Sequence, residues 1–181
     1  MEVFSRLQYQ SQPANPQAVK AGALPEFPRT TYALADGPST PENPVAAERI
    51  RLARQSESAG KIEAAIQNYQ AALTADANNP VALDRLAWIL STSGQPELRD
   101  GKAAVQLAVK AVQLTEWRRP SMIVTLASAY AAAGQFAKAV FAARFARDLA
   151  IITGQSDVVA SSTKLISQCA GGPPTGALDG Q

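Results

Sequence analysis

A leucine–alanine pair recurs in this chain, each time eight residues before a glycine. The pairs are Leu52-Ala53, Leu86-Ala87 and Leu126-Ala127, and the glycines are Gly60, Gly94 and Gly134. After each glycine, small or aromatic residues stand four apart, as in Ala65/Tyr69, Ala104/Ala108 and Ala139/Ala143. A spacing of four places residues on one face of an α-helix. The chain thus repeats a helix–turn–helix unit about every 34 residues, which favours an α-helical array.

Proline, asparagine and glycine mark the expected ends of the helices. In Asn43-Pro44 and Asn79-Pro80 the asparagine suits the N-cap and the proline suits the first helical position, and Pro120 opens a third unit in the same way. Helix ends that favour a left-handed residue fall at Gly60, Gly94, Gly134 and Gly154. We therefore predict helices at residues 44–59, 62–76, 80–93, 100–115, 120–133, 136–153 and 156–169.

The sequence divides into an arm, a repeat region and a tail. Residues 1–42 contain six prolines and no clear periodicity, so we expect an extended or disordered N-terminal arm. Residues 43–169 hold the repeats, as units of about 46–79, 80–119 and 120–153 with a capping helix at 156–169. Residues 170–181 are rich in glycine and proline and are expected to form a disordered tail.

Composition argues against catalysis and nucleic-acid binding. The chain has no histidine and a single cysteine, Cys169. Without histidine, the commonest general base and the commonest metal ligand are missing, and the sequence carries no phosphate-binding loop or metal-ligand cluster. We therefore predict that the protein is not an enzyme and uses no cofactor or metal. A net charge of +2 is too small to indicate a nucleic-acid partner.

The sequence does not direct the chain to a membrane. Residues 1–10 lack the basic start and apolar run of a signal peptide, and no stretch approaches 18 uninterrupted apolar residues. We expect a cytoplasmic protein with no direct membrane span. A periplasmic or membrane-peripheral location would fit a chain that had been processed from a longer precursor.

The repeated motif resembles that of the tetratricopeptide repeat (TPR) family over residues 44–153, and the capping helix extends the match to about 169. The family's first-helix pattern reads Leu83, Leu86-Ala87 and Leu90 in the second unit, and Ile123, Leu126-Ala127 and Tyr130 in the third. The resemblance is to bacterial members. It implies an all-α, right-handed α-solenoid of about three helix–turn–helix repeats plus a capping helix. It also implies a non-catalytic protein–protein interaction module, that is, an adaptor or scaffold.

In this family the first helix of each unit lines a concave groove. The matching positions are Ala47, Ile50, Arg51, Arg54, Glu57 and Ser58, then Val81, Asp84, Arg85, Trp88, Ser91 and Thr92, then Ser121, Val124, Thr125, Ser128, Ala131 and Ala132. From these, the residues implied to contact a partner are Arg51, Arg54, Asp84, Arg85, Trp88, Thr125 and Ser128.

Such a groove would be basic at one end and would carry Trp88 near its middle. It would suit an extended, acidic peptide with an apolar side chain, because arginine pairs with carboxylates and tryptophan supplies contact area. A second interpretation stays open. Arginines on a helix face are often solvated or paired with neighbours such as Glu48 or Asp84, and Trp88 can pack between helices.

The arm offers a different mode of binding. Phe4 and Tyr9 lie in one apolar cluster, and Phe27 and Tyr32 lie in another. Such an arm is either a solvated linker or a segment that docks on a partner or on its own repeats. The alternative function is therefore a structural or assembly subunit of a larger complex, a membrane-associated one included, that is anchored through its arm.

Overall fold

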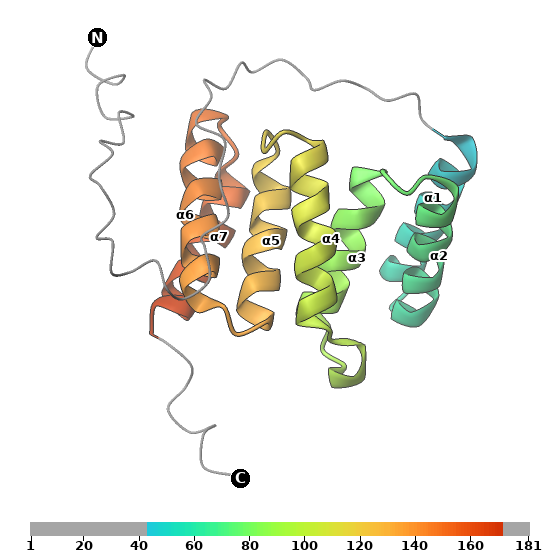
Figure 1. The fold of residues 1–181 in the computed structure, drawn as a ribbon, viewed down its shortest axis with the longest axis horizontal. Coiled ribbons are helices and arrows are strands. Elements are labelled where there is room, and N and C mark those ends of the chain that lie inside the picture. The colour runs from blue at the N-terminus through green and yellow to red at the C-terminus, as the bar shows by residue number, and fades with distance from the viewer. Residues whose placement is uncertain (1–42, 172–181) are drawn as a thin grey trace.

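The computed structural model describes residues 43–171, which form seven α-helices (Figure 1). Their bounds are α1 (Pro44–Ser58), α2 (Ile62–Ala75), α3 (Pro80–Thr92), α4 (Gly101–Leu114), α5 (Pro120–Ala132), α6 (Phe136–Ile152) and α7 (Ser156–Ala170), with a short 3-10 helix, η3 (Pro96–Leu98), before α4. Within residues 43–171 there is no strand, so the predicted all-α class is confirmed. Each predicted helix is present, with ends within one residue of the prediction.

Two sequence predictions fall outside the described residues. The arm at 1–42 contains the proposed contact residues Phe4, Tyr9, Phe27 and Tyr32. The tail lies at 172–181 apart from its first two residues, which end α7 and follow it. Both stay predictions.

Asparagine side chains cap α1 and α3, as the Asn-Pro pairs predict. The Asn43 Oδ1 accepts the backbone N–H groups of Val45 and Ala46 at 3.0 and 3.2 Å. The Asn79 Oδ1 accepts hydrogen bonds from the backbone N–H groups of Val81 and Ala82, both at 3.1 Å. The Asn43 amide also donates to the carbonyl of Ala75 at 3.0 Å, which ties the start of α1 to the end of α2.

Three of the four helix-end glycines are left-handed. The φ angles of Gly60, Gly134 and Gly154 are 71°, 72° and 71°, where glycine is favoured because it has no Cβ. Gly94 lies outside the left-handed region, so that prediction is wrong. The connection after α3 is longer than the others and turns through η3, closed by a bond from the Asp100 N–H to the α3 carbonyl of Leu90 at 3.0 Å.

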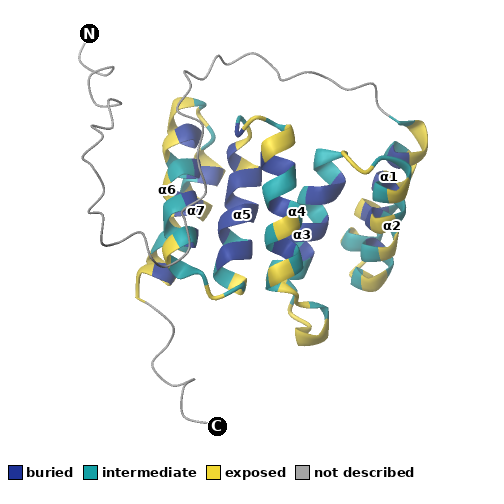
Figure 2. Ribbon diagram, in the orientation of Figure 1, coloured by how far each residue is buried: buried dark blue, intermediate teal, exposed yellow. Residues whose placement is uncertain are grey.

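Helices that are consecutive in sequence pack against each other along a row that runs from α1 and α2 at one end to α6 and α7 at the other (Figure 1). In addition, α3 packs on α5 and α5 packs on α7. As a result α5 is surrounded, and most of its residues are buried (Figure 2). The row has polar character at its far end, where Ser161, Lys164 and Gln168 of α7 are exposed. No helix within residues 43–171 is long and apolar enough to cross a membrane.

The buried side chains form two cores. The larger core runs from α3 to α7 and includes Ile123 and Leu126, both fully buried. The smaller core joins α1, α2 and one side of α3 around Ile50, Tyr69 and Leu86. Alanine dominates where helices approach most closely, and the buried residues of α6 are Ala139, Ala142, Ala143, Ala146, Leu149 and Ala150.

Close approach also explains a glycine that the sequence did not single out. Gly101 begins α4 beside the end of α5, and a Cβ at this position would lie 2.7 Å from backbone atoms of Ala132 and Ala133. At the other end of α4, Trp117 is 8% exposed and packs edge-on against Phe145, with ring centroids 6.4 Å apart. Cys169, the one cysteine of the sequence, is 6% exposed on the inner side of α7.

Candidate partner-binding site

A depression of about 210 Å³ opens between α1 and the start of α3. Its lining residues are Ala47, Ile50, Arg51, Arg54, Asn79 and Val81. All of these except Asn79 are positions that the family register assigns to the groove. The structure therefore brings four of the six groove residues predicted for the first unit together with Val81, the first one predicted for the second.

The depression combines an apolar floor with a cationic rim. Ile50 is 7% exposed and belongs to the smaller core, so it is held in place from beneath. Arg54 is exposed and forms no ion pair with any residue between 43 and 171. A guanidinium in this state can bind a carboxylate through two parallel hydrogen bonds without first breaking another pair.

Arg51, at the same rim, is already paired. Its guanidinium donates to both carboxylate oxygens of Glu48, at 2.7 and 2.8 Å. The hydrogen bond from Arg51 lowers the pKa of Glu48, and the pair is exposed to solvent on α1. A partner that binds Arg51 would first have to break this pair, which costs little at the surface, so Arg51 is a second candidate beside Arg54.

Arg85 takes part in a link between three helices. Its Nη2 donates to Oε1 of Glu57 at 2.8 Å, and the hydroxyl of Tyr69 donates to Oε2 of the same carboxylate at 2.8 Å. Burial, followed by the bond to Glu57, raises the pKa of Tyr69 to about 12. Arg85 thus pairs with Glu57 and not with Asp84, and its charge is neutralised within the fold.

Asp84 and Thr125 lie in the contact between α3 and α5. Burial raises the pKa of Asp84, while the Thr125 hydroxyl and the charges of Arg85 and Arg119 act in the opposite direction. Its Oδ1 is buried and accepts no hydrogen bond from the described part of the chain. Thr125 is 4% exposed. The register placed both residues on an open groove, but because α3 packs directly on α5, Thr125 is buried and Asp84 is half-buried.

Trp88 and Ser128 are half-buried. Trp88 follows Asp84 by one helical turn, and Ser128 follows Thr125 by nearly one, so each pair shares a helix face. The seven predicted contact residues therefore fall into three groups. Arg51 and Arg54 line the depression, and Arg85 belongs to the three-helix link. The other four lie on the faces of α3 and α5 that carry Asp84 and Thr125.

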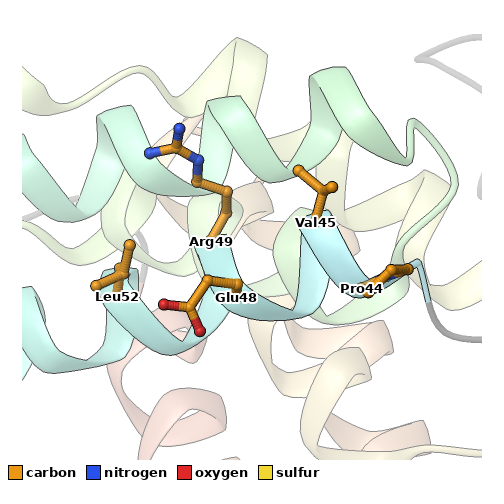
Figure 3. A pocket seen from close by; sticks show the side chains of 5 residues that line it. All are labelled: Pro44, Val45, Glu48, Arg49 and Leu52. Carbon is orange, nitrogen blue, oxygen red and sulfur yellow. The ribbon is translucent and has the colours of Figure 1, made fainter.

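Sequence reasoning missed the link of Tyr69, Glu57 and Arg85. The available signal was the tyrosine itself, since a buried phenol needs a hydrogen-bond partner. It also missed a broader hollow of about 480 Å³ on the outer face of α1, formed by Pro44, Val45, Glu48, Arg49 and Leu52 (Figure 3). All five residues come from one helix, so this hollow is an open helix face, with Val45 58% exposed.

The described residues hold no cluster of three or more acidic or cysteine side chains that could bind a metal ion. No protein-family model matches this chain, and no curated protein matches it either. The likeness to tetratricopeptide repeats therefore still depends on the motif residues alone.

Proposed function

We propose that this chain is a tetratricopeptide-like array of three helix pairs and a capping helix, and that it binds a partner peptide without catalysis. The observation that carries the proposal is the depression between α1 and α3. It joins an apolar floor at Ile50 to a guanidinium, Arg54, that has no ion pair with any described residue, at positions the family register assigns to the groove.

The chemistry of the depression specifies the partner. Its volume of about 210 Å³ is too small for a folded segment and suits side chains of an extended peptide. An aliphatic side chain would cover Ile50 and Val81, while a neighbouring carboxylate would pair with Arg54. Specificity then lies in a short motif of one acidic and one aliphatic residue.

The arrangement of the helices supports a solenoid. Contacts of α3 with α5 and of α5 with α7 are those expected when the first helices of successive units stack, and the polar outer side of α7 suits the end of an array. A cytoplasmic location is part of the same proposal.

A structural subunit is the second candidate. One observation favours it: the outer face of α1 is apolar and open, with Val45 58% exposed, at the end of the row where residues 1–42 join. Exposed apolar faces of this kind often mark interfaces.

A peptide-display selection on the full chain tests the first proposal. We expect enriched peptides to pair an acidic with an aliphatic residue, and to lose binding at least tenfold in Arg54→Glu. The matched control is Arg49→Glu, an exposed arginine on the outer face of α1 that should leave binding unchanged. Peptides that bind Arg54→Glu as well as the parent, or that bind only when Arg49 is intact, would refute the groove site and favour the subunit role.

A further inference from the structure

The first helix pair is less firmly attached to the array than the other pairs are to one another. The smaller core attaches it to one side of α3 through Ala82, Leu86 and Ile89. This core is separate from the larger one, and the two share only the partly buried Leu73, Leu90 and Leu107. The packing of α2 on α3 is less extensive than that of α4 on α5, the equivalent junction. Moreover, α1 does not pack along α3 in the way that α3 packs along α5.

A polar link spans this weak junction. Glu57 near the end of α1 accepts a bond from Tyr69 of α2 and another from Arg85 of α3, each at 2.8 Å. Of the ion pairs between described residues, Arg85–Glu57 is the one that joins two different helices. The Glu57 side chain is 16% exposed, so water competes little for its oxygens. Lys110 adds a smaller tie from α4 to the carbonyl of Ala77, at 2.7 Å.

The binding depression lies at the same junction. Residues of α1 form one wall, and Asn79 and Val81 at the start of α3 form the other. Any change in the angle between the first helix pair and α3 must therefore change the width of the depression.

We propose that the α1–α2 pair is a hinged unit, that Glu57 latches it to α3 through Arg85, and that the latch sets the width of the binding depression. Opening needs the loss of the Arg85 pair and of the packing of Leu86 and Ile89 in the smaller core, but it leaves the larger core intact. The hinge depends only on the packing and the link, whereas its effect on binding rests on the proposed function.

Hydrogen exchange of the full chain, without ligand, tests the hinge. In Glu57→Gln we expect amide exchange in residues 44–75 to rise about fivefold, while α5 and α6 keep their protection. Tyr69→Phe leaves the Arg85 pair in place and removes only the hydroxyl that orients the Glu57 carboxylate, so it should act in the same direction with a smaller effect. This second variant keeps the test available if Glu57→Gln fails to fold. Glu48→Gln is the matched control, because it breaks an ion pair inside α1 and should change nothing.

Two results would overturn the hinge. One is an equal rise in exchange across α5 and α6, which would make the array one cooperative unit. The other is unchanged exchange in residues 44–75 of both Glu57→Gln and Tyr69→Phe.

The effect on binding is measured with a peptide from the display selection. Tyr69 is fully buried and cannot touch a ligand, so a change in peptide affinity in Tyr69→Phe would support regulation by the latch, provided that it is absent in Asp148→Asn, which changes an exposed carboxylate on α6. Equal affinity for Tyr69→Phe and the parent would refute regulation and leave the hinge standing. If no peptide binds, the proposed function fails while the exchange result still decides the hinge.

Discussion

At the scale of single residues, Asp84 is an acidic side chain whose burial is only partly compensated by hydrogen bonds and charges. The residue is half-buried where α3 packs on α5, and its Oδ1 is buried and accepts no hydrogen bond from the described residues. Burying an ionised group without full compensation is unfavourable, which is why the pKa of Asp84 is raised. Asp84 therefore weakens the fold at neutral pH.

Replacing Asp84 with asparagine should stabilise the protein by about 1 kcal/mol at pH 7, because the neutral amide is easier to bury. The folded chain holds the Asp84 proton more tightly than the unfolded chain does. The loss of stability that ionised Asp84 causes is therefore fully present above its pKa in the folded chain. This loss disappears as the pH falls toward 3.8, the pKa of Asp84 in the unfolded chain. The advantage of Asp84→Asn should shrink accordingly between pH 7 and pH 4.

Urea denaturation at several pH values measures this effect. Asp148→Asn, which removes an exposed carboxylate on α6, is the control and should shift stability by less than about 0.5 kcal/mol. A variant Asp84→Asn that is less stable than the parent at pH 7 would show that the charge is compensated after all.

At the scale of helices, two features of the ends matter: caps and close contacts. The Asn-Pro pairs and glycines let the sequence place every helix end within one residue, since caps and left-handed positions are local properties. Gly94 shows the limit of local reasoning. Whether Gly94 must be left-handed depends on the connection between α3 and α4. That connection is longer than the others and turns without a left-handed glycine.

Asn79→Ala should destabilise the protein by about 1 kcal/mol, because two N–H groups at the start of α3 lose their acceptor. Thermal unfolding followed by circular dichroism measures the loss. The neighbouring Asn78 is exposed and caps no helix, so Asn78→Ala is the matched control. Equal melting temperatures for the two variants would show that the cap contributes nothing.

Gly101→Ala should destabilise the protein by about 1–3 kcal/mol, because the added methyl group meets rigid backbone of Ala132 and Ala133 at 2.7 Å. Gly94→Ala introduces the same methyl group where nothing lies within 4 Å, and it should be nearly neutral. Denaturant midpoints compare the two. If α4 can shift away from α5 without loss, the two alanine variants will have the same midpoint.

At the scale of the whole molecule, the structure depends on distances that no local pattern encodes. Arg85 and Glu57 are 28 residues apart, and their pairing depends on how the first helix pair meets α3. The burial of Thr125 likewise depends on how closely α3 approaches α5. The register of the family that the motif resembles predicts that Arg85, Glu57 and Thr125 face a groove. A sequence register cannot predict whether such a helix face stays open to solvent, because packing between neighbouring helix pairs decides this.

The two cores predict unequal responses to core substitutions. Both tryptophans, Trp88 and Trp117, lie outside α1 and α2, so their fluorescence reports on the rest of the array, whereas circular dichroism reports on every helix. In Ile50→Ala, which weakens the smaller core, we expect the dichroism signal to fall at lower urea than the fluorescence signal.

In Ile123→Ala, which opens a cavity in the larger core, the two signals should change together, with a loss of about 2–4 kcal/mol. Coincident curves in Ile50→Ala would mean that the array unfolds as one unit despite its divided core.

The burial of Cys169 gives the molecule a built-in reporter. Because the sequence has a single thiol, a maleimide can react at one place only, and that place is on the inner side of α7. Burial also raises the pKa of this thiol, so the closed state reacts slowly. The labelling rate of the unmodified protein therefore reports how often its last helix lifts away from the helices beneath it.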